Sequence, residues 1–334
     1  MNIPKCFMFF SKQKFPSVHK NFCSCVEYEL HKKVTSNVNN SDILNQYSAD
    51  LSDVVPNHSQ SFNLAAYVNN SDILKNLMSL NVNLSKIEKK PYIVEKILKL
   101  DFDKDIKNHI FFLKDYVDNE SIGSFITKNP LILCEAILDL EVRINYLQSK
   151  HFTCNEIRRI VAKNPFWLMF STVRIDKRLG YFQKTFDLTG NEVRYLATKQ
   201  PLLITYNMHH ITTNSFVIKE EMGFNDKEVK ELILVKPKLW MMNQRSLLER
   251  FKFIHNTMKI SHENILQNSN ILTYRNFVVR QRHLFLQKLG RAQYDPKKEN
   301  YVPLNELCLG SDVEFCTKYA KSNIDDFNTF LKTL

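Results

Sequence analysis

Residues 153–165 read TCNEIRRIVAKNP, residues 189–201 read TGNEVRYLATKQP, and residues 225–237 read NDKEVKELILVKP. The three stretches begin 36 residues apart and share one order of features. A short residue with a side-chain oxygen comes first, apolar residues follow at helical spacing, and a proline ends the stretch. Repetition at such a period indicates a stacked architecture, because each unit can bury its apolar face only against its neighbours.

The first half of each repeat unit carries the start and stop signals of an α-helix. The predicted N-caps, whose side chains can accept from the unpaired N–H groups of a first turn, are Asp118, Thr153, Thr189, Asn225 and Ser261. In three units a Glu follows three residues later and completes a capping box, namely Glu156, Glu192 and Glu228. Because proline lacks an N–H and restricts the residue before it, the helices are predicted to end at Pro130, Pro165, Pro201 and Pro237.

The second half of each unit is a short apolar piece followed by another helix. A cation stands thirteen residues after the proline in three units, as Arg143, Arg178 and Arg250, and Asn214 replaces it in the fourth. A degenerate final unit reaches Arg282 and has Asn270 where a proline would stand. Trp167 and Trp240 follow the prolines at apolar positions and are predicted to be core residues. With no strand signal, the fold class is predicted to be an all-α solenoid of helix, proline corner and helix.

Composition argues against an enzyme. The chain of 334 residues has only six glycines, too few for a phosphate-cradling loop or a dinucleotide fingerprint. Its seven cysteines form no C-x-x-C pair, and no H-E-x-x-H occurs among ten histidines. Asp101, Asp103 and Asp105 alternate without the glycine of a calcium loop. We therefore expect no catalytic residue, no metal and no cofactor, and no apolar run is long enough to span a membrane.

The N-terminal segment reads as a targeting leader. Before Glu27 the chain has four lysines and no acidic residue, which resembles a mitochondrial transit peptide, although its cations are Lys rather than Arg. A cytosolic tail is the alternative. The predicted organisation is a transit peptide at residues 1–30, a polar linker at 31–65, helical repeats at 66–290 and a C-terminal helical cap at 291–334.

Positive charge is concentrated in the repeats. Residues 150–300 hold 26 Lys and Arg against 13 Asp and Glu, whereas the whole chain has a net charge of +11. A strip of cations, one or more per unit, could follow a phosphate backbone. The residues predicted to bind nucleic acid are Lys128, Arg158, Arg159, Lys163, Arg194, Lys199, Lys236, Arg275, Arg280 and Arg282. The alternative for the lysines is that a cation in a last helical turn complements the helix dipole, and for Arg143, Arg178 and Arg250 that they pack between units.

These patterns resemble the mitochondrial transcription termination factor (mTERF) family. The likeness rests on the recurring proline corner, on LSKIEKKP at 84–91, LDFDKDI at 100–106 and RLGYFQK at 178–184, and on the long block RHLFLQKLGRAQYDP at 282–296. The resemblance implies a left-handed, half-ring superhelix whose basic concave groove holds nucleic acid. It also implies a monomer in the mitochondrial matrix that restrains mitochondrial DNA transcription and supports assembly of the large ribosomal subunit through ribosomal RNA. Its partners would be mitochondrial double-stranded DNA, ribosomal RNA and ribosome assembly factors.

A protein-interaction scaffold built of helical repeats is the rival interpretation. The Trp, Gly and Tyr pattern of tetratricopeptide repeats is absent, and the proline falls in the middle of each unit. A helical reader of one base per repeat would need polar specificity residues at matched positions, where this chain has Lys or Arg, which contact phosphate. Sensitivity of binding to salt separates nucleic acid from protein as the ligand. Duplex DNA and folded RNA stay open, since both offer the same charged backbone.

Overall fold

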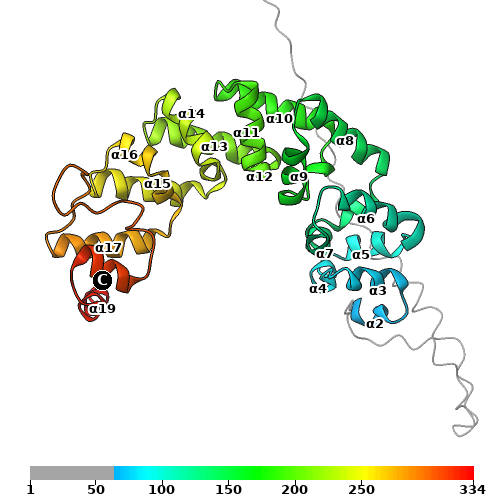
Figure 1. The fold of residues 1–334 in the computed structure, drawn as a ribbon, viewed down its shortest axis with the longest axis horizontal. Helices are drawn as coiled ribbons and strands as arrows, with labels where there is room; N and C mark the ends of the chain where they lie inside the picture. The colour runs from blue at the N-terminus through cyan, green and yellow to red at the C-terminus, as the bar shows by residue number, and fades with distance from the viewer. Residues whose placement is uncertain (1–63) are drawn as a thin grey trace, which may run out of the picture. The chain divides into compact units, whose positions relative to one another are not determined.

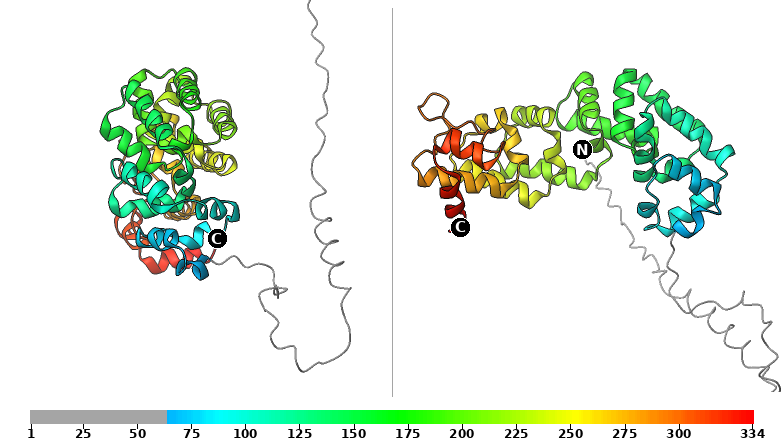
Figure 2. Two further views of the ribbon diagram at one scale, coloured as in Figure 1. Left: turned by 90° about the vertical axis from the view of Figure 1, so that its right-hand side faces the viewer. Right: turned by 60° about the horizontal axis from the view of Figure 1, so that its bottom comes forward.

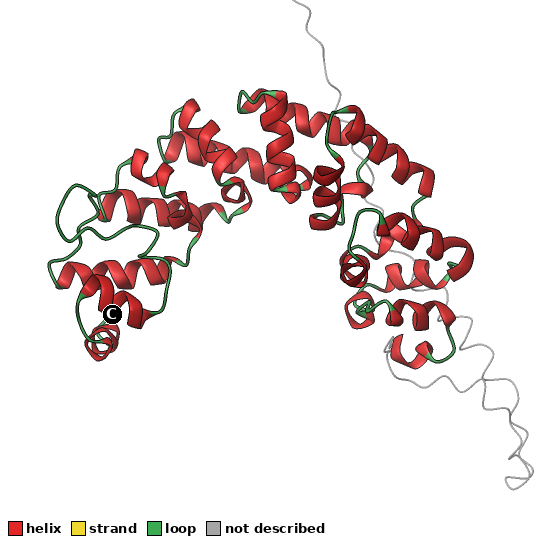
Figure 3. Cartoon of the chain, viewed as in Figure 1, coloured by secondary structure: helices red, strands yellow, loops and turns green. Residues whose placement is uncertain are grey.

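A computed structural model describes residues 64–334 of the chain. The predicted transit peptide at 1–30 and nearly all of the predicted linker at 31–65 lie outside the described residues. The last two residues of the linker, 64 and 65, belong to a helix. Every regular element across residues 64–334 is helical and none is a strand, as Figure 3 shows. In this part of the chain no helix is long and apolar enough to cross a membrane. The prediction of an all-α solenoid is confirmed.

Four complete units repeat the order helix, proline corner, helix. Their first helices are α7 (Asn119–Lys128), α9 (Cys154–Lys163), α11 (Gly190–Lys199) and α14 (Asp226–Val235). The corners are one-turn pieces, η3 (Pro130–Cys134), η4 (Trp167–Met169), α12 (Pro201–Thr205) and η6 (Pro237–Met241). The second helices are α8 (Ile137–Ser149), α10 (Thr172–Thr185), α13 (Met208–Phe216) with the π-turn η5 (Val217–Glu221), and α15 (Gln244–Lys252) with η7 (Phe253–Thr257). Each first helix ends before its proline, as predicted.

Shorter elements flank these units. On the N-terminal side lie α2 (Leu64–Val68), α3 (Asp72–Ser79), α4 (Leu84–Ile87), α5 (Pro91–Leu98), η2 (Phe102–Ile106) and α6 (Lys107–Lys114). On the C-terminal side lie α16 (His262–Gln267), η8 (Ser269–Thr273), α17 (Asn276–Lys288), α18 (Asp312–Phe315), η9 (Cys316–Ala320) and α19 (Ile324–Leu331). Consecutive units lie beside one another in chain order, with α11 packed against both α9 and α14 (Figures 1 and 2).

The predicted caps form at the first helices, with one exception. Capping boxes are present at Thr153, Thr189 and Asn225, each with the Glu three residues on. Ser261 also accepts from the amide of its third helical residue. Asp118 is the N-cap of α7, but its side chain makes no cap hydrogen bond. The amide it would serve, that of Ser121, donates instead to the Asp118 carbonyl at 2.8 Å.

One apolar core runs from unit to unit. Trp167 and Trp240 are 1% and 0% exposed, so the prediction that they are core residues is confirmed. The Trp240 indole N–H donates to Ser215 Oγ at 2.9 Å, which satisfies its one polar atom. From η4 onward, each corner therefore packs between the first helix of its own unit and the second helix of the preceding unit.

The register of the degenerate last unit differs from the prediction by one residue. Ser269, not Asn270, occupies the proline position, because it is the first residue of the corner turn η8. The Ile271 amide donates to the Asn268 carbonyl as the Leu239 amide does to Lys236 in the preceding corner. Arg282 then falls thirteen residues after the corner, at the same position as Arg250 after Pro237.

Candidate nucleic-acid interface

Four lysines, here called the corner lysines, stand at the ends of successive first helices: Lys128, Lys163, Lys199 and Lys236. Lys128 and Lys163 are exposed, and neither makes a hydrogen bond or ion pair within the described residues. Lys199 is half-buried and donates to the Leu234 carbonyl at 2.8 Å and to the Tyr195 hydroxyl at 3.0 Å. Lys236 donates to Asn270 Oδ1. The corner lysines on α9, α11 and α14 thus form a row on packed helices.

Arg159 shares this face, because it lies one turn before Lys163 on α9. Its Nε donates to the Thr198 carbonyl of the next unit at 3.1 Å. Lys199 donates to the equivalent acceptor one unit later, the Leu234 carbonyl, which lies 36 residues after that of Thr198. These side chains therefore join neighbouring first helices at the ends where carbonyl groups are unpaired.

Arg158 and Arg194 lie on another side of the first helices, seven residues before the proline, which we call the strut position. Arg158 Nε donates to the Asp115 carbonyl at 3.0 Å, and Arg194 Nη1 donates to the Lys150 carbonyl at 3.3 Å. Lys230, 36 residues after Arg194, donates to the Asp187 carbonyl at 2.7 Å. Each of these carbonyls lies at the end of a second helix two units earlier in the chain, namely α6, α8 and α10. The strut cations thus hold units together, a role that the regular spacing signalled but the sequence analysis did not assign.

A hollow opens beside two of the predicted arginines. It has a volume of about 490 Å³ and is lined by Lys114, Asp118, Arg158 and Arg159 among others. One junction further on, a hollow of about 300 Å³ is lined by Lys150, Asp176 and Arg194 among others. Arg158 and Arg194 therefore keep a face open to solvent while their hydrogen bonds reach the ends of α6 and α8, two units earlier.

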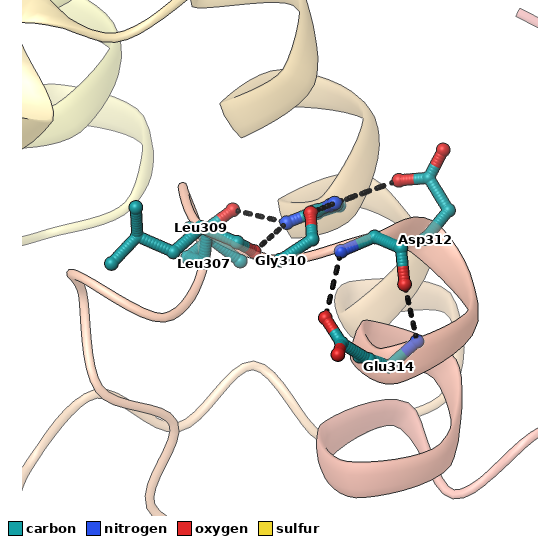
Figure 4. Close-up of polar contacts among 7 residues, drawn as sticks. Leu307, Leu309, Gly310, Asp312 and Glu314 are labelled. Atoms are coloured by element: carbon teal, nitrogen blue, oxygen red, sulfur yellow. Dashed lines mark hydrogen bonds and ion pairs between the residues drawn. The ribbon is translucent and has the colours of Figure 1, made fainter.

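The structure separates the three arginines of the C-terminal cluster. Arg275 is exposed, and the guanidinium of Arg280 lies 4.8 Å from the centre of the Phe253 ring. Arg282 is only 3% exposed. Its guanidinium donates to the carbonyls of Leu307, Leu309 and Gly310 and to the Asp312 carboxylate, at 3.2, 2.7, 2.9 and 2.8 Å (Figure 4). Arg282 is therefore a structural residue, and its prediction as a nucleic-acid contact is corrected.

Arg282 belongs to a series of buried or half-buried donors on the second helices. Arg143, Arg178, Asn214 and Arg250 each donate to a backbone carbonyl of the following corner. Burial lowers the pKa of Arg178 and of Arg250, which is the cost of holding a cation there. Asn214 also donates to the following corner, but through a neutral amide: its Nδ2 donates to the Met242 carbonyl at 2.8 Å. Packing between units, the alternative left open for these arginines, is thus their role in the structure.

His109 extends the series by one unit toward the N-terminus. Its Nε2 lies 2.7 Å from the carbonyl oxygen of Glu135, the residue that ends the Pro130 corner. Sequence inspection missed this histidine because it is not a permanent cation and the unit that contains it has no corner proline in the regular place. Across residues 64–334 there is no group of three or more His, Cys, Asp or Glu side chains that could hold a metal ion.

The described chain is thus a helical-repeat protein whose corners carry a row of lysines, with no strand among residues 64–334. It belongs to the mTERF family, whose family model matches residues 8–293. The chain is 48% identical over 277 residues to the Drosophila melanogaster protein "Transcription termination factor 3, mitochondrial", covering 83% of this chain and 78% of that protein. The protein of the same name in Rattus norvegicus is 42% identical over 272 residues, covering 81% of this chain and 66% of its own length. In Mus musculus the values are 42% over 275 residues, with 82% and 67% covered. The protein is mitochondrial.

Proposed function

We propose that this protein is a nucleic-acid-binding regulator of the mitochondrial matrix that restrains transcription of mitochondrial DNA. We also propose that it supports assembly of the large mitochondrial ribosomal subunit by binding ribosomal RNA. In this proposal it acts as a monomer and without catalysis, and ribosome assembly factors are further partners. The names of the three relatives support the link to transcription.

The row of corner lysines is the observation that carries the proposal. Two of them, Lys128 and Lys163, are exposed and have no partner among the described residues, so their ammonium groups are available to phosphates. Arg159, Arg275 and Arg280 keep their charge at the surface as well. In this proposal the row lines the concave groove of a left-handed half-ring. Because Lys and Arg contact phosphate rather than base edges, we expect weak sequence preference.

Salt dependence tests the class of ligand. Neutralising several phosphates releases counterions, so affinity for duplex DNA or ribosomal RNA should fall by at least about tenfold between ~50 and ~200 mM salt. A smaller change would exclude a groove with several phosphate contacts and would favour the protein-interaction scaffold.

Charge reversal tests the site. The double variant K128E/K163E should weaken binding and flatten the salt slope by about two phosphate contacts. Its matched control is K177E/K184E, which makes the same charge change at two exposed lysines of α10 that have no partner among the described residues. Equal loss of affinity in the two variants would mean that net charge, not the corner row, drives binding. Crosslinking in intact mitochondria followed by sequencing would separate DNA from ribosomal RNA.

The leader is a separate part of the proposal. Residues 1–26 are basic and free of acid, so we propose that they direct import. A chain that lacks them should remain in the cytosol when its distribution is followed by cell fractionation. Mitochondrial localisation of that shortened chain would contradict the assignment.

A further inference from the structure

We propose that Lys199, Lys236 and Lys238, here called the lysine triad, form a discrete phosphate-binding site between the Pro201 and Pro237 units. The chemistry of the ligand is a phosphate group, carried either by a nucleic-acid backbone or by a free polyphosphate. If the phosphate belongs to a nucleic-acid backbone, the inference rests on the proposed function. It then adds to that function by naming one specific site within the row of corner lysines.

The triad is assembled from two consecutive units. Lys199 ends α11, Lys236 caps the C-terminus of α14, and Lys238 is the second residue of the corner η6. The corner turns α12 and η6 are in contact, which brings the two unit ends together. The triad therefore exists only when these units are stacked.

Hydrogen bonds hold two of the three ammonium groups in place. Lys199 donates to the Leu234 carbonyl, two residues before Lys236, and to the Tyr195 hydroxyl. Lys236 donates to Asn270 Oδ1 of the next corner. Both side chains are half-buried, so little conformational freedom is left for a ligand to remove. An ammonium group has three N–H donors, and each of the two keeps at least one for a phosphate oxygen.

The triad has no internal counter-ion. None of its lysines forms an ion pair within the described residues. By contrast, Lys230 on α14, the helix that Lys236 caps, forms an ion pair with Glu192 at 3.1 Å. The pKa of Lys236 is lowered, first by burial and then by the charges of Lys238 and Lys199. The free protein thus keeps like charges together at a cost, and an anion at this place would remove that cost.

The other corners lack this concentration of charge. The residue after the proline is Leu131, Phe166 or Leu202 at the three earlier corners, and only the Pro237 corner has a lysine there. At the Pro130 and Pro165 corners the lysine before the proline, Lys128 or Lys163, is not followed by a second lysine after it. The Pro237 corner is therefore the place in the row where one phosphate can meet three ammonium groups.

The first test measures thermal unfolding of the full 334-residue chain, with inorganic tripolyphosphate as the probe and sulfate at equal ionic strength as the control. Wild type should gain thermal stability from tripolyphosphate, and K236Q/K238Q should lose that gain. The variant K227Q/K184Q, which removes two exposed lysines whose side chains have no partner within residues 64–334, should keep it. Without any anion, K236Q should melt above wild type, because it removes a charge that the folded state disfavours. The inference is overturned if tripolyphosphate does not stabilise wild type, or stabilises K236Q/K238Q as much as it does K227Q/K184Q.

A second arm identifies the source of the phosphate. If K236Q/K238Q also loses affinity for duplex DNA or ribosomal RNA more than K227Q/K184Q does, the site takes a backbone phosphate. If duplex and RNA binding are unchanged while the tripolyphosphate effect is lost, the site takes free polyphosphate. Failure of the proposed function would look different, since wild type would then bind neither nucleic acid at low salt while tripolyphosphate still acted through the triad.

Discussion

Arg282 Nη1 lies 2.7 Å from the carbonyl oxygen of Leu309, which ties the last repeat unit to the C-terminal segment. Arg178 makes the same kind of contact inside the array, with Nη1 2.6 Å from the Tyr206 carbonyl oxygen. The segment that contains Leu309 therefore takes the place of a further corner. It closes the exposed end of the array, as terminal repeats of stacked proteins must.

Loss of Arg282 should be a stability defect. R282A removes a buried guanidinium together with its hydrogen bonds to three backbone carbonyls and to the Asp312 carboxylate, so we expect a loss of about 2–3 kcal/mol in the free energy of unfolding. R275A, at an exposed arginine seven residues earlier, should change that free energy by no more than ~0.5 kcal/mol. Urea unfolding of both variants measures the difference. If R282A were as stable as wild type yet weakened nucleic-acid binding, its assignment as a structural residue would be wrong.

At Arg194 the strut position should contribute to stability through its hydrogen bond to an earlier unit. R194A removes the donor to the Lys150 carbonyl at the end of α8, and we expect a loss of about 1 kcal/mol. K227A is the control, because Lys227 is exposed and its side chain has no partner in residues 64–334. Thermal and urea unfolding provide the readout. Equal stabilities for the two variants would argue that the strut contact adds nothing and would leave Arg194 free to serve only a ligand.

Gly123 and Gly180 should respond in opposite ways to alanine. Gly123 occupies the strut position of the Pro130 unit, and a Cβ there would lie 2.0 Å from the Leu80 carbonyl oxygen. G123A should therefore cost several kcal/mol, roughly the upper range for overpacking in a core. G180A meets no atom within 4 Å on α10 and should gain about 0.5–1 kcal/mol from helix propensity. Calorimetry of both variants measures the two effects. A G123A variant as stable as wild type would show that α7 can move away from the end of α3 without cost.

Acidification should destabilise the protein through His283. Burial lowers the pKa of this imidazole, whose Nδ1 lies 2.7 Å from the Tyr294 hydroxyl. The unfolded chain binds a proton near its ordinary pKa of about 6.5 while the folded state stays neutral, so stability is lost as the pH falls below that value. Unfolding free energies of wild type and H283Q should converge or cross between about pH 7 and pH 5, within the range where histidine titrates. Parallel pH profiles for the two proteins would contradict this role.

The local order of elements could be predicted because its causes are short-range. Thr153 with Glu156 makes a cap from four consecutive residues, and Pro165 ends the helix through its own ring. Trp167 could be assigned to the core because it stands at one of the apolar positions that follow the proline in each repeat unit. The sequence pattern predicts the last corner at Asn270, one residue out of register, because no proline marks this corner, and only the turn that begins at Ser269 locates it.

The sequence by itself determined that this chain is a solenoid of helix, corner and helix, since period, caps and prolines act within a unit or between adjacent ones. It also determined that positive charge accumulates in the repeats. Only the tertiary structure decided which cations remain available. Arg158 and Arg282 are the same residue type in the sequence. In the structure Arg158 donates one hydrogen bond and keeps its charge exposed, whereas Arg282 is buried and donates to four acceptor groups. The physical reason is that an arginine's role depends on which carbonyls the neighbouring unit brings within hydrogen-bonding distance, and those carbonyls lie 25 to 43 residues away in the chain.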